Sequence, residues 1–146
     1  MIGNEVVLAT LRCGVVAGSE KLRLTIKKDD KEAMLDWLEK LKESDLIIIV
    51  EGVKDVAALN NLGIPRTRLQ RINKPAYAIA EKLHEHGHKR AIILTDLDPE
   101  GKKLYASFKT NLTRNGVQVD TFFREFLFRN SSLSHIEGID TYFRNL

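Results

Sequence analysis

The sequence is short of the residues and segments that build disulfide scaffolds and membrane spans. It has a single cysteine, Cys13, in 146 residues, which excludes an internal disulfide and a cysteine-based zinc site. That usage is typical of a reducing compartment. No apolar run approaches the roughly 20 residues that a membrane-spanning helix needs, and Val6–Leu11 is too short and too poorly flanked for a secretory signal. We therefore expect a cytoplasmic protein without a membrane partner.

The two common phosphate-binding glycine motifs are also missing. Neither G-x-x-x-x-G-K-[ST] nor G-x-G-x-x-G occurs, so a P-loop or dinucleotide-binding function loses its main support. The composition, 43% hydrophobic and 29% charged, is that of a globular domain with enough residues for a core. A net charge of +3 permits an anionic partner but does not require one.

The most informative stretch is Arg90–Gly101. Its apolar run, Ala91–Leu94, is too short for a helix and predicts a strand that is buried on both faces. Asp96 and Asp98 follow the strand, and Pro99 suits the first turn of a helix that extends to Arg114. Two carboxylates crowded at a strand end repel each other unless a cation lies between them, and oxygen ligands favour Mg²⁺ or Mn²⁺. The alternative is a helix N-cap beside a solvated acid.

A second stretch repeats this design. The apolar run Leu46–Val50 ends on Glu51 and Gly52, and the next ten residues suit a helix that stops at Gly63. Each unit consists of a strand, an acid, a glycine and a helix. Two such units in one small chain favour a shared site over two unrelated caps.

The remaining patterns predict further elements. Residues 1–30 suggest an unassigned extension or hairpin, and Lys31–Glu43 has the apolar spacing of an amphipathic helix with Trp37 in the core. A short strand is expected at Leu69–Ile72, followed by a helix from Pro75 to about Gly87. Three histidines near its end are either a metal site or ordinary polar residues at a helix C-terminus; they are His84, His86 and His88.

The C-terminal third predicts one more strand and a final helix. Val117–Phe122 reads as a strand after the Asn115-Gly116 turn, and Ser131–Leu146 has helical spacing of its apolar residues. Between them, four phenylalanines are interleaved with Arg124 and Arg129. Such an arrangement can stack nucleic-acid bases, and core packing is the alternative.

Counted together, these units predict an α/β fold. We expect a parallel, Rossmann-like sheet of about four strands in the order 2-1-3-4, with helices on both faces. Residues 31–146 would form one domain, with the amphipathic helix at its start and a helical tail at its end. In that order strands one and three are neighbours at the switch point, so Glu51, Asp96 and Asp98 share one crevice. The predicted phosphate-binding cations around it are Lys54, Arg66, Arg68, Arg71, Lys74, Lys102 and Lys103.

The two acidic motifs together resemble a Toprim domain, the catalytic module of topoisomerases, bacterial primases and several nucleases. Ile49–Leu59 (IVEGVKDVAAL), with Leu62–Ile64, is very similar to the primase version of the first Toprim motif. Thr95–Gly101 resembles the D-x-D-x-x-G motif of type IA topoisomerases. Size and layout look most like the small stand-alone Toprim proteins of archaea. The tail segment Ser134–Gly138 resembles this small family as well.

The resemblance implies roles for three residues. Glu51 matches the glutamate that acts as general acid or base, and Asp96 and Asp98 match the Mg²⁺-binding pair; all three are expected at the metal. Other parts of the larger Toprim enzymes have no counterpart in these residues. Among them are the topoisomerase domain with a catalytic tyrosine, the zinc- and helicase-binding regions of primases, and the ATPase domain of OLD nucleases. None of Tyr77, Tyr105 and Tyr142 has a motif around it.

Two kinds of function follow. The first is a Mg²⁺-dependent enzyme that cleaves or transfers a phosphodiester of RNA or DNA. The second is a protein without turnover that binds nucleic acid, alone or with protein partners in a larger processing complex.

Overall fold

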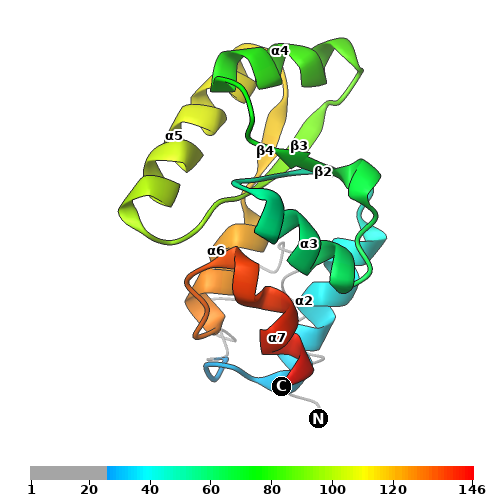
Figure 1. The fold of residues 1–146 in the computed structure, drawn as a ribbon, viewed down its shortest axis with the longest axis vertical. Helices are drawn as coiled ribbons and strands as arrows, with labels where there is room; N and C mark the ends of the chain where they lie inside the picture. Colours follow the sequence, from blue (N-terminus) through cyan, green and yellow to red (C-terminus); the bar gives the residue numbers. More distant parts are fainter. Residues whose placement is uncertain (1–25) are drawn as a thin grey trace, which may run out of the picture.

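The computed structural model describes residues 26–146, in which helices and short strands alternate (Figure 1). Most of the extension or hairpin predicted over residues 1–30 falls on residues 1–25, outside the described part. In chain order the elements are α2 (Lys31–Glu43), β1 (Ile47–Val50), α3 (Val53–Asn61), the 3₁₀ turn η2 (Arg66–Arg68), β2 (Leu69–Arg71), α4 (Ala76–Glu85), β3 (Arg90–Leu94), α5 (Pro99–Arg114), β4 (Gln118–Asp120), α6 (Phe122–Asn130), the 3₁₀ turn η3 (Ile136–Gly138) and α7 (Ile139–Arg144).

The strands form one parallel sheet of four, in the order β2-β1-β3-β4. Val50 at the end of β1 lies opposite Arg71 of β2 and Leu94 of β3. The predicted fold class and strand order are confirmed. Because β1 and β3 are neighbours at the centre, the residues that follow them meet at one edge of the sheet, which is where open α/β sheets bind their ligands.

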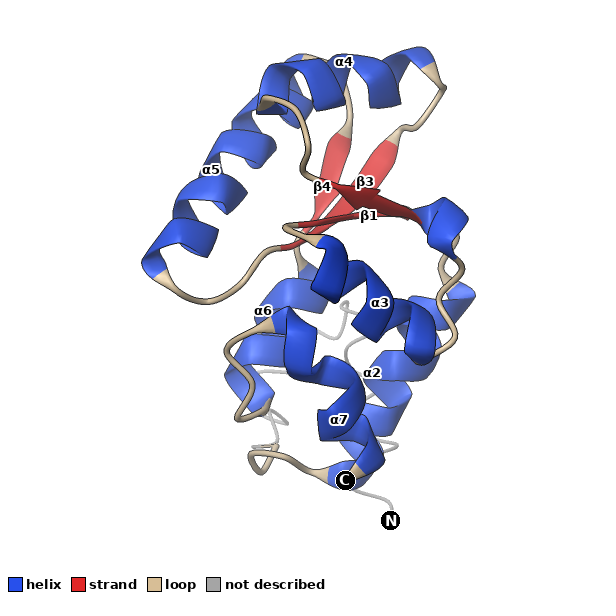
Figure 2. Ribbon diagram, in the orientation of Figure 1, coloured by secondary structure: helices blue, strands red, loops and turns tan. Residues whose placement is uncertain are grey.

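Helices cover both faces of this sheet (Figure 2). One layer of the core joins α2, α3, α6 and the C-terminal tail to Ile48 and Val50. The other joins α4 and α5 to Ile47 and Ile49. Consecutive residues of β1 therefore enter opposite layers, which explains an uninterrupted apolar run instead of alternation. Full burial of each such side chain contributes roughly 1.5–3 kcal/mol.

Helix α2 spans the predicted residues, and its apolar face is buried as the spacing of these residues predicted. Asp30 caps it by accepting a hydrogen bond from the Ala33 N–H at 2.9 Å. Trp37 is buried, and its indole Nε1–H donates to the Phe123 carbonyl at 3.0 Å. The centre of its ring lies 6.0 Å from the ring centre of Phe123 and 6.1 Å from that of Phe143. Trp37 therefore fastens α2 to α6 and to the C-terminal tail, as expected of a core residue.

The predicted strand Val117–Phe122 is wrong at its C-terminal end. The strand stops at Asp120, whose Oδ1 accepts the Phe122 N–H at 3.0 Å, and Phe122 starts helix α6. The helix was not foreseen. It forms because Phe123, Phe126 and Leu127 recur at helical spacing and are all buried. The two buried phenylalanines therefore pack in the core and are not available to stack on bases.

The tail is less helical than predicted. Only Ile139–Arg144 forms an α-helix, after the 3₁₀ turn η3. The two isoleucines at the start of these elements, Ile136 and Ile139, are fully buried against the sheet layer. None of the helices in residues 26–146 has the length and apolar composition of a membrane span.

Candidate functional site

Glu51 and the aspartate pair meet at the carboxyl edge of the sheet, as the sequence predicted. Glu51 directly follows β1, and Asp96 comes two residues after β3. The Asp96 N–H donates to Glu51 Oε2 at 2.7 Å, so the glutamate is joined to the D-x-D loop itself. The three acids thus come from two neighbouring strands and meet at one edge of the sheet.

Each aspartate uses one carboxylate oxygen to hold the backbone. Asp96 Oδ1 accepts the Ile136 N–H at 2.8 Å, and Asp98 Oδ1 accepts the Gly101 N–H at 2.7 Å as the N-cap of α5. The second oxygen of each group is left for another partner. Both interpretations of Asp98 are therefore compatible, because it caps the helix with Oδ1 while its Oδ2 faces His135 at 3.5 Å.

The loop between the aspartates and α5 depends on close backbone packing. Gly101 is buried, and a Cβ on it would lie 2.1 Å from the Asp96 carbonyl oxygen, so no other residue fits without moving the loop. Thr95 Oγ1, also buried, donates to the Gly101 carbonyl at 2.8 Å. The final glycine of the D-x-D-x-x-G motif is therefore required by this packing.

Arg124 of α6 supports the same loop. Its Nε donates to the Thr95 carbonyl at 2.9 Å and its Nη2 to the Asp96 carbonyl at 2.7 Å. The guanidinium lies 4.7 Å from the centre of the Tyr105 ring. The sequence placed Arg124 among possible base-stacking residues, whereas the structure uses it to position the acids.

The environment raises the pKa of Glu51. Burial of the carboxylate is the largest cause, and the negative charges of Asp96 and Asp98 act in the same direction. The Asp96 N–H opposes them. Burial contributes more to this rise in pKa than the neighbouring charges do. A carboxyl group with a raised pKa can release and accept a proton closer to neutral pH.

Asp55 is a fourth acid at this edge, to which sequence reasoning gave no role although it lies within the Ile49–Leu59 motif. Its side chain is only 5% exposed, and its Oδ2 accepts the Gly52 N–H at 3.2 Å. Burial, followed by the charges of Asp96 and Glu51, raises the pKa of Asp55 from 3.8 to about 6.

This raised pKa predicts a specific pH dependence of stability. Well below pH 3.8 Asp55 is protonated in both the folded and the unfolded state, and its burial carries no charge penalty. As the pH rises from there to about 6, the unfolded state loses its proton first, so the folded state is increasingly destabilised. At about 1.4 kcal/mol per pKa unit, the full penalty is of the order of 2–3 kcal/mol. Relative to the wild type, Asp55→Asn should therefore gain that much stability between pH 4 and pH 7.

Urea unfolding in EDTA at several pH values measures this difference. Glu81→Gln, at an exposed position on α4, supplies the control, because it removes a carboxylate that is not buried. A difference curve for Asp55→Asn that does not change with pH would show that Asp55 carries no such penalty.

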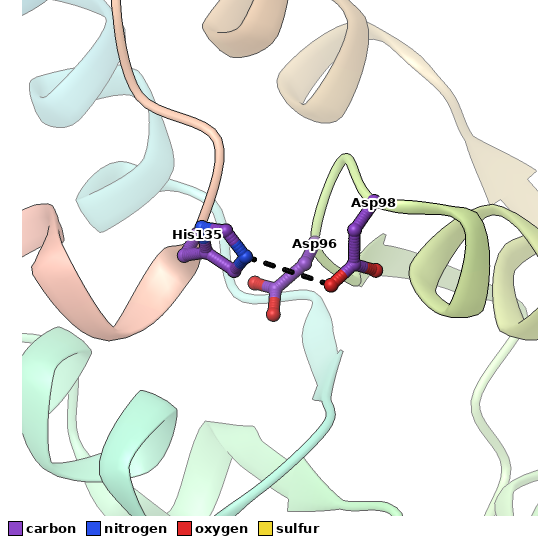
Figure 3. A group of neighbouring side chains, drawn as sticks. All are labelled: Asp96, Asp98 and His135. Atoms are coloured by element: carbon purple, nitrogen blue, oxygen red, sulfur yellow. Dashed lines mark ion pairs between the residues drawn. The ribbon is translucent and has the colours of Figure 1, made fainter.

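His135 is the residue that sequence reasoning missed most clearly. Within residues 26–146, one group of His, Cys, Asp and Glu side chains has its ligand atoms within 4.8 Å of one another, namely Asp96, Asp98 and His135 (Figure 3). Glu51 is not a member of this group. His84, His86 and His88 are not members either, and His86 Nδ1 instead lies 2.7 Å from the Lys82 carbonyl of its own helix.

The predicted cations do not all lie at this edge. Arg66 and Arg68 precede β2 and so lie at the amino edge of the sheet, away from the acids. Arg68 has a different role from the predicted one, because its Nε donates to the Leu46 carbonyl and its Nη1 to the Leu41 carbonyl, both at 2.9 Å. The exposed cations that follow the strands at the acidic edge are Lys54, Arg71, Lys74, Lys102 and Lys103.

Two relatives show by sequence which family this chain belongs to. A UPF0292 protein of Methanocaldococcus jannaschii is 34% identical over 115 residues, which are 76% of this chain and 90% of the relative. The chain belongs to the UPF0292 family. A second member, from Pyrococcus abyssi, is 35% identical over 109 residues, covering 75% of this chain and 78% of that protein.

A solved structure supports the fold independently. A protein from Aquifex aeolicus superposes with a TM-score of 0.64 and 30% sequence identity, covering 71% of this chain and 95% of that one. No protein-family model matches the chain. The kinship and the α/β architecture are thus established, and the activity has to be argued from the site.

Proposed function

We propose that this UPF0292 protein is a cytoplasmic Toprim-type enzyme that cleaves or transfers a phosphodiester of RNA or DNA with the help of Mg²⁺ or Mn²⁺. The observation that carries the proposal is the convergence of Glu51, Asp96 and Asp98 at the switch point of a parallel sheet. Ligands of such sheets bind at that point. The two motifs that supply these acids are also the ones that resemble Toprim domains.

The donor set fits a hard divalent cation. Asp96 and Asp98 each keep one carboxylate oxygen that does not bind backbone, and both residues are half-buried. Mg²⁺ typically takes one or two carboxylates and leaves its other positions to water and substrate phosphate. The bound cation would supply charge neutralisation at the phosphate under attack.

Glu51 is placed to move a proton rather than to serve as a main metal ligand. Its raised pKa keeps a fraction of the group protonated nearer neutral pH. The Asp96 N–H fixes one of its oxygens and leaves the other to reach a substrate hydroxyl or a water molecule. Glu51 would therefore act as general acid or base beside the scissile bond.

Cleavage assays with the full chain test the proposal. Labelled single-stranded, duplex and hairpin RNA and DNA are incubated with Mg²⁺, Mn²⁺ or EDTA, and products should appear only with a divalent cation. Protein carrying Asp96→Asn and Asp98→Asn, purified in parallel, controls for contaminating nuclease. Binding without products on every substrate would favour the non-catalytic alternative, either alone or with a protein partner.

The cations at the acidic edge give a further prediction. Arg71 ends the strand beside β1, and Lys74 lies in the loop that follows. Replacing both by Ala should weaken nucleic-acid binding and reduce the slope of log affinity against log salt by roughly 0.7–0.9 for each phosphate that is no longer neutralised. Fluorescence anisotropy at several salt concentrations measures both quantities.

A matched pair at the opposite edge is the control. Lys89 and Arg114 are exposed and precede β3 and β4, so they lie at the amino edge. Their double replacement by Ala removes the same charge far from the acids. An equal loss of affinity in both double variants would reject a localised binding edge.

A further inference from the structure

The C-terminal tail is built into the acidic site by backbone contacts. The Leu97 N–H, between the two aspartates, donates to the Ser134 carbonyl at 2.9 Å. The Ile136 N–H donates to Asp96 Oδ1 at 2.8 Å, and the Ile136 side chain is fully buried. The residue between these two anchors, His135, is thereby held in a fixed place beside the D-x-D loop.

The imidazole of His135 points at the carboxylates. Its Nε2 lies 3.5 Å from Asp98 Oδ2, and Figure 3 shows Asp96 and Asp98 on one side of the gap with the ring on the other. Ligands about 2.1 Å from a cation lie about 3 Å apart when adjacent and about 4.2 Å apart when opposite. The spacing of 4.8 Å or less within this trio is thus close to that of a coordination shell and needs only a small contraction.

The other ring nitrogen has a partner that suits a metal ligand. Ser134 Oγ lies 3.0 Å from His135 Nδ1. When Nδ1 carries the proton and donates to this hydroxyl, the lone pair is on Nε2 and faces the aspartates. Histidines that bind metals usually have their second nitrogen held by such a hydrogen bond, which fixes the tautomer and the ring orientation.

From these contacts we propose that His135 is a third protein ligand of the cation held by Asp96 and Asp98, and that it shifts the preference of the site from Mg²⁺ toward Mn²⁺ and other transition metals. The inference rests on the proposed metal site. An imidazole nitrogen is a softer donor than a carboxylate; it suits first-row transition metals and contributes little to Mg²⁺ binding. A site made of the two carboxylates alone would lack this bias.

Metal titration by calorimetry provides the first test. Wild type, His135→Gln and His84→Gln are titrated with Mn²⁺ and with Mg²⁺; His84 is an exposed histidine on α4. Loss of a direct ligand should cost at least the tenfold that removal of a supporting partner costs. We therefore expect Mn²⁺ affinity to fall about tenfold or more in His135→Gln, with Mg²⁺ affinity changed less than about threefold. His84→Gln should match wild type for both ions.

Electron spin-echo spectroscopy of bound Mn²⁺ provides a second readout. Wild type should show modulation from a directly bound imidazole nitrogen, and His135→Gln should bind Mn²⁺ without it. His135 is more than half exposed, so its replacement leaves the core intact. Unchanged Mn²⁺ affinity in His135→Gln, or no nitrogen modulation in wild type, overturns the inference.

If the proposed metal site itself is wrong, the same titrations give a different result. In that case wild type binds neither ion, or binding survives the Asp96→Asn/Asp98→Asn change. If the aspartates are required and His135 is not, the inference alone is rejected, and the proposed metal site stands.

Discussion

Glu51→Gln should abolish cleavage while leaving nucleic-acid affinity nearly unchanged or slightly improved. Gln has the same shape and can still accept the Asp96 N–H that Glu51 Oε2 accepts at 2.7 Å, so the loop after β3 stays in place. The substitution removes the titratable group, whose pKa is raised by burial and by the nearby aspartates. Loss of a general acid or base typically lowers the rate by about 10²–10⁴-fold. Single-turnover cleavage rates and anisotropy titrations separate the two effects.

Glu100 offers a matched control for this substitution. It is an exposed glutamate in the first turn of α5, close enough for its charge to raise the pKa of Glu51. Glu100→Gln removes a carboxylate from the same neighbourhood without touching the proposed proton carrier and should keep most of the rate. If Glu51→Gln cleaves as fast as wild type, Glu51 has no role in proton transfer.

The second large effect is expected at the aspartate pair. Asp96→Asn/Asp98→Asn should lower Mg²⁺ and Mn²⁺ affinity by at least about 100-fold, because it removes two charged ligands at once. Asn can still accept the Ile136 and Gly101 N–H groups through its Oδ1, so the fold is retained. Without metal the variant should be at least as stable as wild type, since two like charges no longer repel each other. Calorimetric titration and thermal unfolding in EDTA measure the two quantities.

Asp30→Asn is the matched control for this pair. Asp30 also caps a helix, accepting the Ala33 N–H, but it does so at the start of α2 rather than beside the D-x-D loop. The change should leave metal affinity as it is in wild type. Equal affinity in the wild type and the Asp96/Asp98 double variant would exclude the pair as the metal site.

The sequence predicted the fold and the meeting of Glu51 with the aspartate pair at one sheet edge, because both follow from local patterns and the strand order. Two apolar runs of strand length, each ending on an acid, define β1 and β3, and helical spacing defines α2 over Lys31–Glu43. Once the sheet is parallel with order 2-1-3-4, topology alone brings Glu51 and Asp96 to one edge. No long-range pairing of side chains had to be guessed.

What the sequence did not reveal depends on tertiary contacts. The run Arg66–Lys74 looks like one basic patch, but β2 passes through it and sends its two ends to opposite edges of the sheet. Helix α6 begins directly after the strand signal of Gln118–Asp120, so the two patterns merged. His135 lies in the tail segment Ser134–Gly138, for which the sequence indicated a family resemblance but no role. The backbone hydrogen bonds of Leu97 and Ile136 bring it to the aspartates.

The most direct test of the proposed metal site is anomalous diffraction from crystals of the full chain grown with Mn²⁺. We expect a strong anomalous peak in the crevice after β1 and β3, bonded to carboxylate oxygens of Asp96 and Asp98 at about 2–2.3 Å. Glu51 should lie beside this peak rather than dominate its coordination. A peak elsewhere on the molecule, or none while the same protein binds Mn²⁺ in solution, would contradict the assignment of the acids as the metal site.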